Sequence, residues 1–201
     1  MDRDQAEKAL SIIRGVIEHT RDDLVARNWG QIWMVLAFVN FAGAAGGIWL
    51  ERRETPVLWY ALAVAVVGLL NIVVVVLLVK RDQGVRSYVE WQLWAIWIAF
   101  VVFTLLALGV LHLTDTSPRI FGSVFAMNGG LAFTMMGIVF YRSFLWAGAL
   151  LGVAAILSAM FREAQWLILG GAWWLATFLP GWLAFREQKK RERDGQRTQI
   201  L

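Results

Sequence analysis

Hydrophobic residues in this chain are gathered into six long runs without a charged side chain, and the charged residues lie between or beyond these runs. An α-helix rises 1.5 Å per residue and the apolar core of a bilayer is about 30 Å thick, so roughly 20 residues span it. The pattern predicts an all-α, polytopic membrane bundle of six transmembrane helices, expected at about 29–50, 57–79, 91–113, 120–140, 144–160 and 166–185.

Two of the runs admit another interpretation. Residues 72–76 are an isoleucine followed by four valines, which is typical of a buried strand, but they lie inside the uncharged run 55–79. In lipid a segment must satisfy its own backbone hydrogen bonds, so a helix is favoured there. The fifth run is the shortest and follows Arg142 after a tight turn. A helical hairpin is therefore the alternative to a complete fifth span.

Charged residues concentrate in the segments at the two ends of the chain. Residues 1–28 carry five basic and six acidic side chains and no apolar signal-peptide core, so we expect the first span to direct insertion. Apolar residues recur every three, four or seven positions over 4–26, which predicts an amphipathic helix. The chain thus divides into an amphipathic cytoplasmic or interfacial helix (1–28), the bundle (29–185) and a basic cytoplasmic tail (186–201) that we expect to extend the last helix.

The distribution of basic residues predicts the orientation. Fifteen of the 19 Lys and Arg residues lie in the two end segments and in the second and fourth loops, and four lie in the other loops. Because positively charged segments stay in the cytoplasm, both termini are expected inside. The pattern resembles that of small bacterial six-span proteins, and we expect a multi-pass protein of the inner (plasma) membrane.

Small residues and a proline indicate how the helices pack. Gly43 and Gly47, and likewise Gly148 and Gly152, are spaced as GxxxG pairs, which let helix backbones approach closely. Pro180 in the last run predicts a kink, because proline removes a helix hydrogen bond and clashes with the preceding turn. Most of the 12 tryptophans lie near the ends of the expected spans. Three lie deeper and are expected to pack against small residues of a neighbouring helix; they are Trp97, Trp173 and Trp174.

The polar residues within the six runs are neutral. No ionisable side chain lies at depth, so the usual groups for proton transport, voltage sensing or acid–base catalysis are missing from the spans. The candidate residues for interhelical hydrogen bonding, or for lining a path for a neutral solute, are Asn40, Asn71, Thr104, Asn128, Thr134 and Thr177. Interhelical bonding is the simpler interpretation, and an uncharged lining would suit a solute path.

Composition limits the class of function. Charged residues make up 17% of the chain and hydrophobic residues 59%, against about 25% and 45–50% in soluble domains. This excludes a soluble enzyme and a nucleic-acid-binding module, despite the net charge of +4. The chain has no cysteine, and its two histidines, His19 and His112, are expected a bilayer apart, so we predict no metal, haem or other cofactor site.

These patterns support two hypotheses. The first is a non-catalytic membrane module that scaffolds or regulates a protein partner through its N-terminal helix and basic tail, with the tail attracted to anionic lipids of the inner leaflet. The alternative is a small channel or facilitator for a neutral solute, as a single chain or a homo-oligomer, that uses the Asn and Thr residues. No catalytic residues are predicted. The only weak candidates for an enzyme site are three residues expected at the outer rim of the bundle, His112, Asp115 and Arg119.

Overall fold

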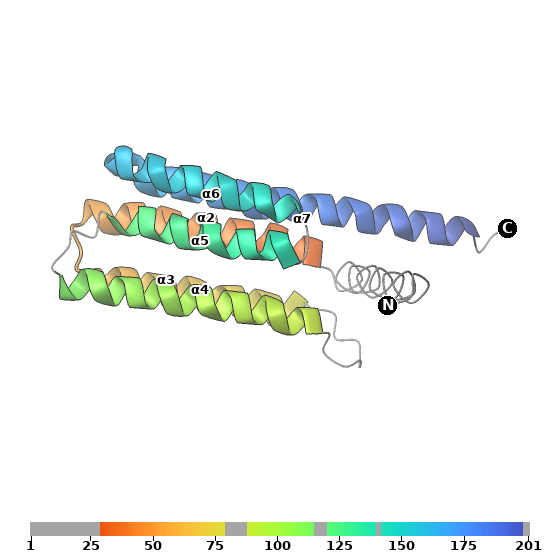
Figure 1. Cartoon of the computed structure of the whole chain (residues 1–201), viewed down its shortest axis with the longest axis horizontal. Coiled ribbons are helices and arrows are strands. Elements are labelled where there is room, and N and C mark those ends of the chain that lie inside the picture. Colours follow the sequence, from red (N-terminus) through yellow and green to blue (C-terminus); the bar gives the residue numbers. More distant parts are fainter. Residues whose placement is uncertain (1–28, 79–87, 115–119, 140–141, 199–201) are drawn as a thin grey trace, which may run out of the picture.

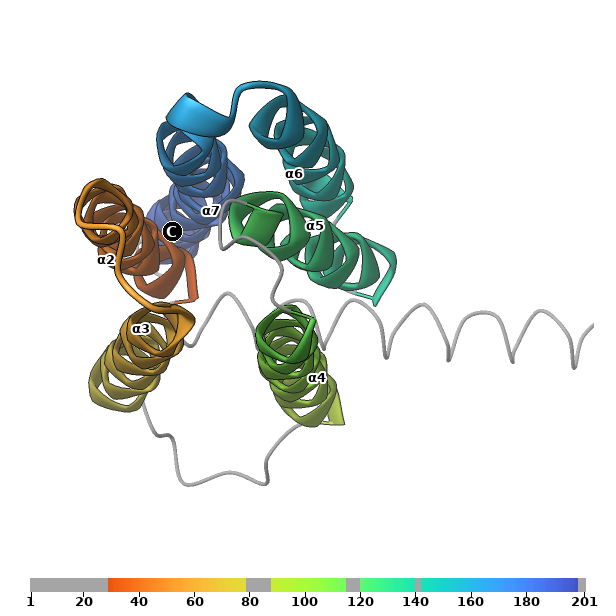
Figure 2. The same ribbon diagram turned by 90° about the vertical axis from the view of Figure 1, so that its left-hand side faces the viewer.

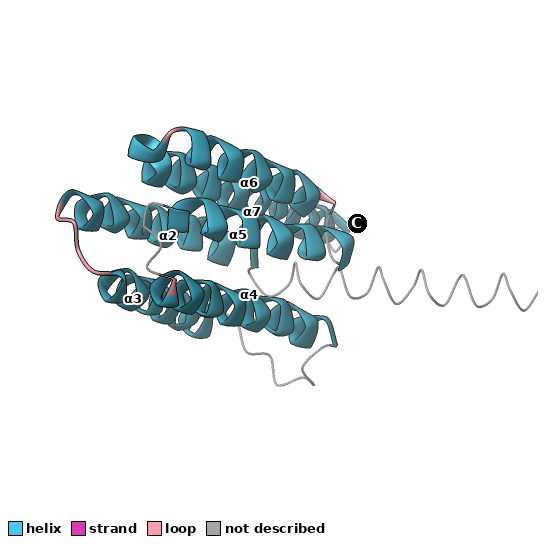
Figure 3. Ribbon diagram, turned by 60° about the vertical axis from the view of Figure 1, so that its left-hand side comes forward, coloured by secondary structure: helices cyan, strands magenta, loops and turns pink. Residues whose placement is uncertain are grey.

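The computed structural model describes residues 29–78, 88–114, 120–139 and 142–198, and its described part is all-helical (Figure 3). The long helices are α2 (Trp29–Arg52), α3 (Val57–Leu78), α4 (Tyr88–Leu113), α5 (Phe121–Val139), α6 (Ser143–Met160) and α7 (Gln165–Thr198), with a short 3₁₀ helix, η2 (Arg162–Ala164). Six helices are long and apolar enough to cross a membrane. This confirms an all-helical fold with six candidate spans among the described residues, and insertion of the bundle in a membrane stays a prediction.

Both alternative interpretations fail. The valine-rich segment lies within α3, and the fifth run forms one helix of 18 residues, α6, rather than a hairpin. The predicted N-terminal amphipathic helix lies outside the described residues. The tail does extend the last helix, because α7 is 34 residues long and ends at Thr198.

The helices lie side by side along one axis, and α2 begins at the same end of the bundle at which α7 ends (Figure 1). Viewed from the other end, α2, α7, α5 and α6 form one group, with α3 beneath α2 and α4 beneath α5 (Figure 2). Only 6% of the apolar part of α3 is buried, compared with 44% for α5 and for α7. The fold is therefore a four-helix core with two more peripheral helices.

Glycines permit the close approach of α2 and α7. A Cβ atom added at Gly30 would lie 2.6 Å from the backbone nitrogen of Phe185 and 2.8 Å from the backbone oxygen of Gly181. Further along the same pair, a Cβ at Gly47 would lie 2.5 Å from the indole of Trp166. Any larger side chain at these positions would push the two helices apart, so the glycine positions determine how deeply α2 packs on α7.

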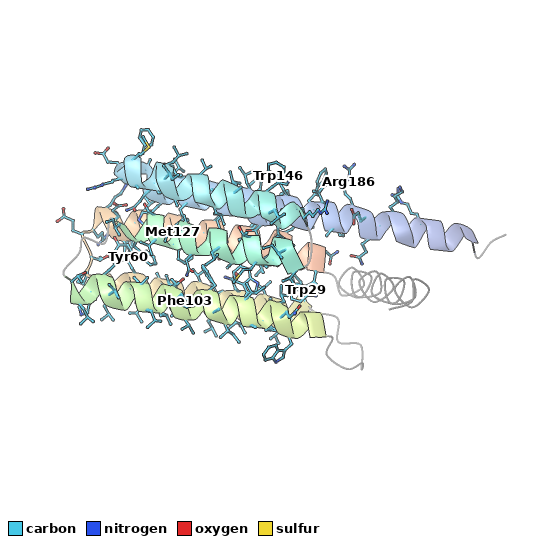
Figure 4. All side chains as sticks on the ribbon, viewed as in Figure 1. Trp29, Tyr60, Phe103, Met127, Trp146 and Arg186 are labelled. Carbon is cyan, nitrogen blue, oxygen red and sulfur yellow. The ribbon has the colours of Figure 1, made fainter. Side chains whose placement is uncertain are left out.

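A continuous series of aromatic rings, here called the aromatic column, fills the interior of the bundle. Its first and last members, Trp29 and Tyr60, lie near opposite ends of the helix bundle (Figure 4). Successive ring centroids are 5.0–6.4 Å apart, within the range of favourable aromatic pairs. In order, the rings are Trp29, Trp33, Phe144, Phe133, Trp97, Phe100, Trp173, Phe125, Phe121, Trp166 and Tyr60.

Pro180 lies inside α7, and the helix continues through it without a break. Proline has no N–H, so the carbonyl of Ala176 loses its usual donor at that turn. The next residue, Gly181, lies against α2, where an added Cβ would be 2.7 Å from Cβ of Trp33. The proline thus lies beside a close contact of α2 and α7, and the kink itself stays a prediction.

Candidate functional site

Two of the candidate polar residues bind each other between α2 and α3. Asn71 Nδ2 donates to Asn40 Oδ1 at 3.0 Å, and Asn40 Nδ2 donates in return to Asn71 Oδ1 at 3.4 Å. Asn40 Nδ2 also donates to the carbonyl of Leu36 in its own helix at 2.8 Å. The reciprocal amide pair joins the peripheral helix α3 to the core, where few other polar groups could specify its position.

A second polar pair joins α4 to α5. Asn128 Nδ2 donates to Thr104 Oγ1 at 2.7 Å and to the carbonyl of Phe100 at 3.0 Å. Thr104 Oγ1 in turn donates to the same carbonyl at 2.7 Å. Thr104 is buried. Among the described hydrogen bonds, a pair of polar side chains thus joins each peripheral helix to the core.

The two remaining threonines bind within their own helices. Thr134 Oγ1 donates to the carbonyl of Gly130 at 2.8 Å, and Thr177 Oγ1 donates to the carbonyl of Trp173 at 2.5 Å. Among the described residues, no hydrogen bond connects these threonines with either asparagine pair. The six candidates thus occupy four places in the bundle, and the aromatic column fills much of the space between its helices.

Trp173 is central to the aromatic column. Its ring contacts those of Phe100, Phe125 and Phe133 at 5.6, 5.0 and 5.7 Å. A Cβ atom at Gly129 of α5 would lie 2.3 Å from this ring, so the glycine is what lets the indole fit. This confirms that the deep tryptophan packs against a small residue of a neighbouring helix. Trp97 contacts aromatic rings in the same column, and Trp174 stacks on Phe178 at 4.7 Å.

A polar cluster at the end of the bundle where α2 ends and α7 begins, here called the loop end, was not predicted from the sequence. Gln165, at the start of α7, is 1% exposed, and its Nε2 donates to Oε1 of Glu51 at the end of α2 at 3.0 Å. The hydroxyl of the buried Ser158, in α6, donates to the backbone oxygen of Gln165 at 3.4 Å. Glu51 and Gln165 each lie one residue outside an expected span, where they looked like ordinary loop residues. The pairing of residues 114 positions apart is a tertiary feature.

The basic end of α7 begins with two cations held over aromatic rings. The guanidinium of Arg186 lies 4.4 Å from the ring centroid of Trp182, and the ammonium of Lys189 lies 4.9 Å from that of Phe185. Cation–π contacts of this kind contribute about 0.5–1 kcal/mol at exposed sites. Arg186 lies at the point where α7 leaves the rest of the bundle (Figure 4).

The described residues contain no group of three or more His, Cys, Asp or Glu side chains that could hold a metal ion. His112 is exposed near the end of α4, and no described residue joins it in a polar cluster. The other members of the candidate rim set, Asp115 and Arg119, lie outside the described residues, as does His19. The arrangement supplies hydrogen bonds between helices and a charged helix end.

Comparisons with protein-family models, with curated proteins and with solved structures find no match to this chain.

Proposed function

We propose that this chain is a non-catalytic integral membrane module that holds a rigid, charged helix at the inner face of the membrane as a docking element for a protein partner. The observation that carries the proposal is the length of α7. It is one helix of 34 residues, roughly 51 Å at 1.5 Å per residue, and the bilayer core is about 30 Å thick. Its last turns continue beyond the ends of α5 and α6 (Figure 1).

The distance from the membrane favours a protein partner over lipid for the far part of this helix. The cations on Trp182 and Phe185 lie at the bundle end and are suited to anionic headgroups of the inner leaflet. Thr198 lies 12 residues beyond Arg186, which corresponds to roughly 18 Å of helix. The surface potential of the membrane decays within a Debye length of about 8 Å. Basic positions in the last turns therefore act mainly on an acidic protein surface.

The sequence of the extension supports a helix in water. Glu187 and Arg191 are four residues apart, in the order that stabilises an isolated helix. The orientation that we propose, with both termini in the cytoplasm of the inner membrane, follows from the excess of basic residues at that end. The amphipathic segment 1–28 would then lie on the same side and add to the docking surface.

Site-specific photo-crosslinking in cells tests this function. A photo-reactive amino acid in place of Arg193, an exposed position of the extension, is expected to give a discrete protein adduct. The same group in place of Met127, which is 64% exposed on the side of the bundle, is expected to give mainly lipid adducts. Arg197→Glu, which reverses a charge in the last turn of α7, should reduce the protein adduct several-fold, while Arg197→Lys should leave it unchanged. Exclusively lipid adducts at position 193 would contradict the proposal.

The facilitator for a neutral solute stays a prediction. In the described residues the asparagines of α2, α3 and α5 use their amides in hydrogen bonds between helices, so a path lined by them would have to open one of these pairs. Solute flux into liposomes, compared for the wild-type chain, Asn40→Leu and Asn128→Leu, tests it. Unchanged flux in both variants excludes the asparagines as a lining.

A further inference from the structure

Basic residues at the end of α7 lie on one face of the helix, here called the basic stripe. Its four members are all exposed, and they are Arg186, Lys189, Lys190 and Arg193. At 3.6 residues per turn they cover about 100° of the circumference of the helix. Arg197 continues the same helical register, whereas Arg191 lies off this face. The positive charges of the extension are therefore aligned on one side of α7.

The basic stripe faces away from α2. A Cβ atom added at Gly181 would lie 2.7 Å from Cβ of Trp33, so this face of α7 packs on α2. Gln188 follows about two turns later on the same face and is half-buried. Lys190 follows Gly181 after about two and a half turns, which places it on the opposite face.

The face of α7 that carries the stripe is also exposed along the bundle. Leu175, Leu179 and Trp182 precede Arg186 on this face, because the successive spacings are four, three and four residues. Their exposed fractions are 39%, 47% and 38%. The outer face of α7 is thus apolar within the span and basic beyond it, and the stripe is open to a molecule that approaches from the side.

Acidic residues flank the basic stripe on both sides. By helical position, Glu187 and Asp194 lie next to one edge of the stripe and Glu192 lies next to the other. A broad polyanion, such as a nucleic acid or an anionic membrane, would meet these carboxylates together with the cations. A partner with one narrow row of carboxylates between basic residues avoids that repulsion and gains from the flanks as well.

On the basis of the docking function proposed above, we propose that the basic stripe binds an acidic α-helix of a protein partner, laid along α7 with its row of carboxylates facing the stripe. A helix fits because its own residues return to one face every three or four positions, the spacing at which the cations of the stripe recur. The axes of packed helices are about 8–10 Å apart, a distance that pairs of long charged side chains bridge at the edges of coiled coils.

Peptide binding to the full-length protein in phosphatidylcholine nanodiscs tests this class of partner. Two fluorescent helical peptides of identical composition are compared by anisotropy. One has its glutamates on a single face, flanked by lysines, and the other has them distributed around the helix. We expect the one-faced peptide to bind about ten-fold more tightly, because several individually weak ion pairs form together. This preference should shrink as salt is added.

Two substitutions with the same change of charge separate the stripe from the rest of the extension. Lys190→Glu reverses a charge in the stripe and should bring the affinities for the two peptides within about two-fold of each other. Arg191→Glu reverses the adjacent charge off the stripe and should keep a preference of about ten-fold. Helical circular dichroism of both variants checks that the extension is folded. If Lys190→Glu loses helix, Lys190→Gln is expected to lower the preference about three-fold.

The remaining outcomes separate this partner from the docking function. Equal affinity for the two peptides, or equal losses in the two variants, excludes an acidic helix on the stripe. A protein adduct at position 193 in cells would then still support docking, whereas lipid adducts alone contradict docking itself. Tighter binding of a single-stranded oligonucleotide of equal charge assigns the stripe to nucleic acid and overturns the proposal. Loss of peptide binding in nanodiscs that contain phosphatidylserine assigns it to lipid, with the same consequence.

Discussion

At the scale of single residues, two kinds of interaction hold the helices together: hydrogen bonds between polar side chains and packing between aromatic rings. The asparagines of α2, α3 and α5 sit among apolar neighbours, where an amide without a partner is costly, and each finds its partner on the adjacent helix. The aromatic rings between them need space to pack, and the indole N–H groups of Trp29, Trp166 and Trp173 are buried without a hydrogen-bond partner among the described residues. Gly129 supplies that space for Trp173.

The Asn40–Asn71 pair is expected to contribute coupling energy. Asn40→Leu should lower the free energy of unfolding by about 1 kcal/mol, because it leaves Asn71 without its partner. In a double-mutant cycle measured by unfolding in mixed micelles, Asn40→Leu and Asn71→Leu should show a coupling of about 0.6 kcal/mol. Asn40→Leu and Asn128→Leu, which lie in different pairs, should be additive. Additivity within the first pair would show that the reciprocal hydrogen bonds do not stabilise the fold.

The glycine beneath Trp173 is expected to be intolerant of a methyl group. Gly129→Ala places a carbon 2.3 Å from the indole ring and should lower the free energy of unfolding by about 1–3 kcal/mol through overpacking. Gly152→Ala is the matched control, because a Cβ there meets nothing within 4 Å. Thermal melts of the two variants in the same detergent measure the difference. Equal melting temperatures would mean that the aromatic column repacks freely.

At the scale of elements, α7 is the longest of the described helices and runs from one end of the bundle to beyond the other (Figure 1). It begins at the Glu51–Gln165 cluster, packs along α2 and ends in the charged extension. The helix reaches from the cluster to the extension because its 34 residues form one continuous helix, which Pro180 does not break. The peripheral helix α3 differs from α7 because it buries little of its surface and is held to α2 by its asparagine pair.

The extension of α7 is expected to behave as a rigid continuation of the bundle. The chain has no cysteine, so spin labels can be placed on Arg193→Cys in the extension and Leu113→Cys at the far end of α4 without a background. Pulsed dipolar spectroscopy should give a narrow distance distribution. Glu187→Pro, which breaks a helix at a cost of about 3 kcal/mol, should broaden it, and Glu187→Ala should not. A distribution that is already broad in the labelled parent would refute the rigid helix.

At the scale of the whole molecule, an even number of helices places the start of α2 and the end of α7 at one end (Figure 1). The aromatic column occupies the interior of the described bundle from one end to the other, so side chains fill the space between the helices. Interaction with other molecules is therefore expected at the two ends and on the outer faces of the helices.

Cysteine accessibility in intact cells tests the orientation of the whole molecule. Glu54→Cys and Glu163→Cys lie at the loop end and should react with a membrane-impermeant maleimide added outside. Thr198→Cys, at the end of α7, should react only after the cells are opened. This follows from the 15 basic residues that the sequence assigns to the side of the termini, out of 19. Labelling of position 198 in intact cells would reverse the topology.

Length and polarity were enough to predict the six helices. A run such as 120–141 has the length of a bilayer crossing and no charge, and a backbone in an apolar medium has only the helix to satisfy its own hydrogen bonds. The continuation of α7 beyond residue 185 was predictable for a related reason, because charged helix formers follow the last span directly. Trp173 could be assigned to packing because its depth ruled out the interface.

Which residues pair between the helices could not be predicted from length and polarity. The pairing of Asn40 with Asn71, and of Asn128 with Thr104, depends on which helix faces which, and an apolar run has no polar face that would reveal its neighbours. Glu51 and Gln165 are separated by 114 positions and each looks like a loop residue. Hydrophobicity is a property of each segment alone, so the order of residues sets the helices. Hydrogen bonds and close packing are properties of pairs, and only the folded chain determines which pairs form.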